Sequence, residues 1–249
     1  MRSLQDHYET HRVFPAEING FTDSVVQRLR DLVQGGLVGT YLVGSAALGG
    51  YVHGRSDIDV IAVASTALTT SEKQAIVEIL SHPRLECPTS GLEFVLYELA
   101  SVATPRSDAA FEINLNTGPR MELHVSFDPA ADPRHWFIID RAIARIHGVR
   151  LCGPQPERLF SPLPRLWILQ ALSEALVWHR THDLVGTTAS STPVAPGSTP
   201  PRAAGRRRRV PQGGRRRARR RWDHSSIAVS RFARAWGFRN PIAPRSRGF

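Results

Sequence analysis

The chain has 249 residues, 41% of them hydrophobic, which is enough for one large domain or two small ones with a packed core. No apolar run reaches the roughly 18 residues that span a membrane, and the N-terminus lacks the apolar core of a secretory signal. Two cysteines imply no disulfide framework and favour a reducing compartment, so we expect a cytoplasmic protein without a membrane partner.

The net charge of +10 is concentrated at one end of the chain. Residues 187–249 hold 16 of the 32 basic residues and a single acid, Asp223, for a net charge of +15, whereas residues 1–186 carry −5. The two arginine blocks, 206–209 and 215–221, would neutralise phosphates without sequence selectivity. Because no base-reading motif accompanies them, we expect no specific nucleic-acid partner; a nonspecific nucleic-acid binder remains the alternative.

The first predicted element is a helix. Hydrophobic residues recur at helical intervals from 20 to 34, and Thr22 or Asp23 could cap the helix before Gly35–Gly36 ends it.

Alternating and continuous apolar runs then predict a mixed sheet. The predicted strands, in chain order, are 37–45, 56–65, 91–102, 111–118 and 121–127, with a turn at 117–119. The predicted helices that follow the first one are 69–82, 132–148 and 162–183. The fold class is therefore α/β, a mixed sheet with flanking helices, with the last helix opening a helical C-terminal part.

The stretch "GSAALGGYVHGRSDIDVIAV" (44–63) carries the chemistry. Asp57 and Asp59 are two apart in a predicted strand, so their side chains project from the same face. Two adjacent carboxylates repel each other unless a cation lies between them, and oxygen ligands suit Mg²⁺. The turn at Gly44 and Ser45 lets the backbone approach a phosphate and adds a hydroxyl donor. The alternative is a pair of solvent-facing acids at a strand end.

This pattern, a hydrophobic residue and Gly-Ser followed by Asp-hydrophobic-Asp, resembles the signature of the nucleotidyltransferase superfamily that includes polymerase-β-like enzymes. Segments 111–154 and 159–178 are similar to the bacterial aminoglycoside adenylyltransferases that modify streptomycin and spectinomycin, and the resemblance covers about residues 20–186. It implies a polymerase-β-like nucleotidyltransferase domain, followed by a truncated helical domain. It also implies ATP- and Mg²⁺-dependent O-adenylylation of an aminoglycoside hydroxyl, an antibiotic-resistance activity, by a protein expected to be a monomer.

The resemblance also implies roles for individual residues. Glu93 matches the third carboxylate of the family, which deprotonates the drug hydroxyl and is a candidate metal ligand beside Asp57 and Asp59. The competing Glu98 is an odd number of residues away and so lies on the opposite face. Gly44, Ser45 and Ser56 are the expected nucleotide contacts, although Ser56 could instead cap the strand.

Several other polar residues are interpreted as structural. Asp128, Asp132 and Asp140 lie near predicted helix starts and read as caps or surface charges. His179 and His182 lack a third ligand at metal-binding spacing. Cys152 precedes a Gly-Pro turn and is expected to be inert.

The sequence departs from the family at two places. An aromatic residue stacks on the drug in streptomycin-modifying members, and the aligned residue here, Asn114, cannot stack, which argues against streptomycin itself. The second departure begins at residue 187, where a helical segment is expected and a Pro- and Arg-rich one is found.

One choice of codons for the stretch 187–206, read in a shifted frame, spells DSVLNACRAWQYAAEGRW, which resembles the missing family segment. We therefore divide the chain into a nucleotidyltransferase domain (1–150), the start of a helical domain (151–186) and an off-frame, disordered tail (187–249). Transfer to another target, such as a protein hydroxyl in a toxin–antitoxin pair, is the remaining alternative function.

Overall fold

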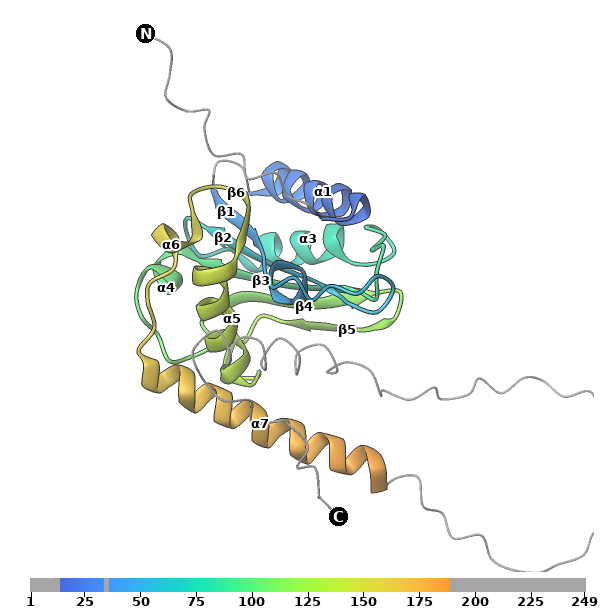
Figure 1. Cartoon of the computed structure of the whole chain (residues 1–249). Coiled ribbons are helices and arrows are strands. Elements are labelled where there is room, and N and C mark those ends of the chain that lie inside the picture. The colour runs from blue at the N-terminus through green and yellow to red at the C-terminus, as the bar shows by residue number, and fades with distance from the viewer. Residues whose placement is uncertain (1–13, 34–35, 189–249) are drawn as a thin grey trace, which may run out of the picture.

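The computed structural model describes residues 14–33 and 36–188 of the chain (Figure 1). The predicted tail lies outside the described residues except for its first two positions, 187 and 188. None of the helices within these ranges is long and apolar enough to cross a bilayer.

A six-stranded sheet in the order β5-β4-β3-β2-β1-β6 forms the centre of the fold. Its strands are β1 (Leu37–Leu42), β2 (Ile58–Ala64), β3 (Leu92–Glu98), β4 (Phe111–Gly118), β5 (Met121–Ser126) and β6 (Val149–Cys152). Strands β2 and β3 are parallel, whereas every other neighbouring pair is antiparallel. A parallel pair needs a crossover connection, and α3 (Thr70–Leu80) supplies it.

Helices cover both faces of the sheet (Figure 1). On one face, α1 (Ala16–Leu32) and α3 pack over a core that includes Ile58, Val60 and Ala62. On the other, α5 (Arg134–His147), α7 (Arg165–Thr188) and the short helices α4 (Leu99–Ala103) and α6 (Pro156–Leu159) enclose a second core, to which β2 contributes Ile61 and Val63. The alternation along β2 thus places successive side chains in opposite layers.

The predicted mixed sheet with flanking helices is confirmed. Strand β4 has the bounds that the sequence predicts, and α3 begins with a capping box, in which Thr69 and Glu72 satisfy each other's backbone N–H groups. Two predicted strands prove shorter and are followed directly by helices: α2 (Gly44–Ala47) follows β1, and α4 follows β3.

Three local predictions differ from the structure. Helix α1 begins at Ala16, so Thr22 lies inside it and its hydroxyl donates to the Ile18 carbonyl at 2.9 Å instead of capping the helix. Strand β6 was not predicted, and it places Cys152 beside Thr40 of β1 rather than in a turn. The expected domain division at residue 150 falls within this strand, and the division into two domains stays a prediction.

Candidate active site

A row of four polar residues crosses the sheet on one face. Asp59 of β2 pairs with Glu93 of β3, Glu93 pairs with Asn116 of β4, and Asn116 pairs with His124 of β5. Directly paired residues project from the same face of neighbouring strands. Strand register alone therefore gathers residues that lie far apart in the sequence.

Three carboxylates meet at one end of this row. Asp57, just before β2, joins Asp59 and Glu93 so that one oxygen from each lies within 4.8 Å of the others. Asp57 is only 8% exposed. Burial raises the pKa of Asp59 well above its usual value, and the neighbouring carboxylates of Asp57, Glu93 and Asp140 raise it further, while the Ser45 backbone N–H opposes the rise. The three carboxylates therefore repel one another when they are ionised, and a cation bound between them would relieve this repulsion.

The turn after β1 is shaped around Asp59. Gly44 has a φ of +61°, and a Cβ atom there would lie 1.9 Å from Asp59 Oδ2, so glycine alone fits. The next residue, Ser45, is buried, and its hydroxyl has no hydrogen-bond partner among the described residues. A buried, unsatisfied hydroxyl in a cavity wall is a ready donor for a ligand oxygen.

Ser56 lies in a different environment from Ser45. Its hydroxyl accepts a hydrogen bond from the Val52 backbone N–H at 2.9 Å, and its own N–H donates to the Val52 carbonyl at 2.9 Å. Ser56 is fully buried and is absent from the cavity wall described below. This geometry favours the strand-end role that the sequence left open.

A cavity of about 270 Å³ opens over the polar row. Besides the three carboxylates, its wall includes Gly44, Ser45, Asn114, Asn116, His124, Asp132, Trp136, Asp140 and Trp178. The structure thus brings together Gly44, Ser45 and all three predicted carboxylates.

Two residues of the cavity wall, Asp140 and Asp132, do not have the cap or surface roles expected from the sequence. Asp140 lies in the middle of α5, where burial raises its pKa to about 7 and the Arg141 charge opposes the rise. Asp132 is held between Asn114 and His124. Neither Asp140 nor Asp132 is a helix cap or a surface charge. Asp128, in contrast, is exposed as expected, and its carboxylate accepts a hydrogen bond from the Ala130 N–H at 2.9 Å. A signal for Asp140 was present, because Trp136, Asp140 and Ile143 have the spacing of one helix face.

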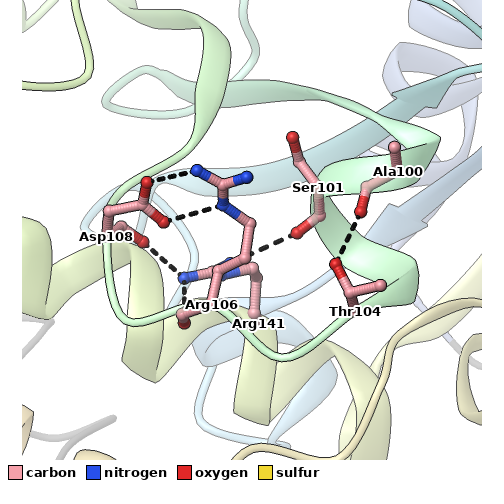
Figure 2. A network of polar contacts seen from close by, with 6 residues as sticks. All are labelled: Ala100, Ser101, Thr104, Arg106, Asp108 and Arg141. Atoms are coloured by element: carbon pink, nitrogen blue, oxygen red, sulfur yellow. Dashed lines mark hydrogen bonds and ion pairs between the residues drawn. The ribbon is translucent and has the colours of Figure 1, made fainter.

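A buried arginine fixes the helix that carries Asp140 (Figure 2). The guanidinium of Arg141, 3% exposed, donates to four backbone carbonyls, those of Phe137, Ser101, Arg106 and Asp108. Ser101 lies in α4, and Arg106 and Asp108 lie in the segment between α4 and β4. Since neighbouring residues on a helix point in different directions, anchoring Arg141 to this segment leaves Asp140 facing the cavity.

Aromatic side chains form another part of the cavity wall. Trp136 of α5 and Trp178 of α7 meet edge to face with their ring centroids 5.8 Å apart. His179 packs against both rings, which agrees with the structural role expected for it. The side chain of His182 lies outside the described residues.

Comparisons with known proteins find relatives that share one name. It is 28% identical over 181 residues to an "aminoglycoside (3'') (9) adenylyltransferase" of Shigella flexneri and to one of Escherichia coli, covering 69% of this chain and 67% and 66% of those proteins. A Klebsiella pneumoniae protein of the same name is 29% identical, covering 60% of this chain and 59% of that protein. The chain thus matches about two thirds or less of the length of these relatives. The resemblance predicted from the sequence is confirmed, although no family model matches the chain.

Solved structures that match part of the chain are also found. The spectinomycin adenyltransferase AAD(9) of Enterococcus faecialis, crystallised with ATP and spectinomycin, is 19% identical with a TM-score of 0.45, covering 63% of this chain and 64% of that one. A toxin–antitoxin structure with AMP-PNP is 15% identical with a TM-score of 0.31, covering 68% of this chain and 98% of that one.

Proposed function

We propose that this chain, a homologue of aminoglycoside adenylyltransferases, transfers the adenylyl group of ATP to a hydroxyl of an aminoglycoside and thereby confers antibiotic resistance. The observation that carries the proposal is the cluster of Asp57, Asp59 and Glu93, with oxygens within 4.8 Å of one another in the wall of the cavity.

The three carboxylates fit Mg²⁺. They offer only oxygen ligands. Burial first, and then the neighbouring carboxylates, raise the pKa of Asp59, and a cation bound there would favour its ionised form. Bound there, Mg²⁺ would neutralise charge on the phosphates of ATP and polarise the bond to be broken. The Ser45 hydroxyl and the backbone at Gly44 would contact a phosphate oxygen, while Ser56 would hold the turn before β2.

Glu93 is the proposed general base. It lies between the metal-binding Asp59 and the amide of Asn116 in the polar row. An alcohol is a weak nucleophile until a nearby base takes its proton. Glu93 would take the proton as the drug oxygen attacks the α-phosphorus and pyrophosphate leaves.

The cavity wall favours spectinomycin over streptomycin as the acceptor. Asn114 lines the cavity at the position predicted to stack on streptomycin, and its amide is hydrogen-bonded to Asp132. An amide held in this way offers polar contacts in place of an aromatic face.

The test is transfer of radioactive label from ATP to a panel of aminoglycosides, with the full chain and with a variant in which the shifted frame is restored after Gly186. Label from α-³²P-ATP, but not from γ-³²P-ATP, should appear in a drug, with spectinomycin favoured. Asp57→Ala and Asp59→Ala should abolish transfer. Transfer of γ-label, or no transfer by either protein, would contradict the proposal.

A further inference from the structure

The cavity holds a second polar cluster, separate from the three carboxylates, which we call the Asp132 cluster. Its members come from three segments: Asn114 from β4, His124 from β5, and Asp132 from the loop before α5. Asn114 Nδ2 donates to Asp132 Oδ2 at 3.1 Å, and His124 Nε2 lies 3.1 Å from Asp132 Oδ1. Each carboxylate oxygen is therefore fixed by a different strand.

The Asp132 cluster lies far enough from Glu93 to contact a different part of the same acceptor molecule. His124 is two strands away from Glu93 along the polar row, and neighbouring strands are about 4.8 Å apart. The separation of roughly 10 Å spans one or two sugar-sized rings. An acceptor with its hydroxyl at Glu93 would place a distant substituent at Asp132.

The charge in the cavity indicates which substituent fits. Five carboxylates line the wall, whereas no lysine or arginine of the described residues does. The side chain of Asp132 is 12% exposed. One of its oxygens accepts from the uncharged amide of Asn114, and the other lies against the His124 ring, so no lysine or arginine pairs with this carboxylate within the cavity wall. A largely buried carboxylate is stabilised by a cation, and the nearby rings of Trp136 and Trp178 also favour one.

We propose that Asp132 is a specificity-determining residue that binds an ammonium group of the acceptor, with Asn114 and His124 as the residues that position its carboxylate. The proposal rests on the proposed function for the identity of the acceptor. It assigns to Asp132 a role in drug affinity, not in metal or nucleotide binding.

The experiment compares Asp132→Asn with Asp128→Asn, using the full chain and its frame-restored variant. Asparagine keeps the shape of Asp132 and removes its charge. Asp128 is four residues away on the same loop, exposed and absent from the cavity wall, so it controls for the loss of one negative charge. Spectinomycin and streptomycin are titrated calorimetrically with Mg²⁺ and α,β-methylene-ATP, which cannot donate its adenylyl group.

Asp132→Asn should weaken binding of the better drug about 10- to 100-fold, as expected for loss of one charged hydrogen bond. Its affinity should also fall less steeply with salt than that of the wild type. Asp128→Asn should bind like the wild type, and all three should bind the nucleotide equally. Unchanged drug affinity in Asp132→Asn, an equal loss in Asp128→Asn, or a wild type that binds neither drug would overturn the proposal.

The label-transfer assay separates this inference from the proposed function. If Asp132→Asn loses drug affinity and no α-label is ever transferred, the proposed function fails and the binding role stands. If wild type and Asp132→Asn transfer label with the same KM for the drug, the function stands and the binding role fails.

Discussion

Gly44 and Asp59 lie so close together that no side chain can be added between them. An alanine at 44 would place its Cβ 1.9 Å from Asp59 Oδ2 and would also have to adopt a φ of +61°. Gly49 has a φ of +67° and nothing within 4 Å of the position of a Cβ, so an alanine there would be destabilised only by its strained backbone conformation. Substitutions at the two glycines therefore distinguish the effect of backbone strain from the effect of displacing a carboxylate of the proposed metal site.

We predict that Gly44→Ala loses Mg²⁺-dependent nucleotide binding, whereas Gly49→Ala retains it. Gly49→Ala should be destabilised by about 1–2 kcal/mol, because alanine is strained at a positive φ, and Gly44→Ala by more, because its Cβ also clashes with Asp59. Nucleotide titration with and without EDTA, together with thermal melting, measures the two effects. Equal nucleotide affinity in the two variants would show that the contact with Asp59 does not matter.

Glu93 and Glu98 lie near opposite ends of β3, so a substitution of Glu98 can serve as the control for the same substitution of Glu93. Glu93 pairs with Asp59 in the cavity, whereas Glu98 pairs with Ala64 at the far end of the strand. We expect Glu93→Gln to keep Mg²⁺ and ATP binding largely intact, because Asp57 and Asp59 remain. Turnover should fall about 10²–10⁴-fold, because the amide cannot accept the hydroxyl proton. Glu98→Gln should turn over normally in the same steady-state assay. Normal turnover by Glu93→Gln would exclude it as the base.

Asp140 should make the metal-free protein less stable as pH rises. Its folded pKa of about 7 lies above the unfolded value of about 3.9. Between these values the folded state holds more protons than the unfolded state, so the free energy of unfolding falls as pH rises from about 4 to 7.

We therefore predict that Asp140→Asn, relative to wild type, gains about 1–3 kcal/mol of stability between pH 4.5 and pH 8. Urea unfolding in EDTA at both pH values measures the difference between the two proteins. Parallel pH profiles for wild type and variant would show that Asp140 titrates normally.

At the scale of elements, the guanidinium of Arg141 adds a buried polar anchor to the apolar packing of α5 (Figure 2). Arg141→Met would leave four carbonyls without their donor, at a cost of about 2–4 kcal/mol. Arg106 forms an exposed ion pair with Asp108, so Arg106→Met should cost at most about 1 kcal/mol. Chemical denaturation of both variants tests the contrast, and similar losses would mean that Arg141 does not anchor α5.

The elements also show what could be predicted from the sequence. Asp57 and Asp59 were predictable because strand alternation places them on one face, and Glu93 was predicted from the resemblance to the family. Asp132 was not, since its partners Asn114 and His124 meet it only through the register of β4 and β5 with the following loop. Strand β6 is four residues long and depends on pairing with β1, a contact over about a hundred residues that local periodicity cannot reveal.

At the scale of the whole molecule, α7 connects the cavity to an exposed apolar surface. Trp178 lines the cavity, while Leu166, Leu169 and Val177 on the same helix are 63%, 37% and 58% exposed. Their spacing places these three side chains on one side of α7. Exposed apolar side chains grouped in this way favour contact with a further element or aggregation.

The last prediction is that the shifted reading frame after Gly186 supplies such an element. Read in that frame, the chain continues with DSVLNACRAW, whose apolar residues could pack beside α7 and complete the acceptor side of the cavity. Correct placement of a drug hydroxyl against the α-phosphate can contribute about 7–11 kcal/mol to catalysis, so we expect the chain as written to adenylylate weakly or not at all. The frame-restored variant should be more soluble and should transfer α-label at least a hundredfold faster. DNA sequencing across codons 180–200 tests the premise directly. Codons that cannot encode the shifted peptide, or equal activity of the two proteins, would refute it.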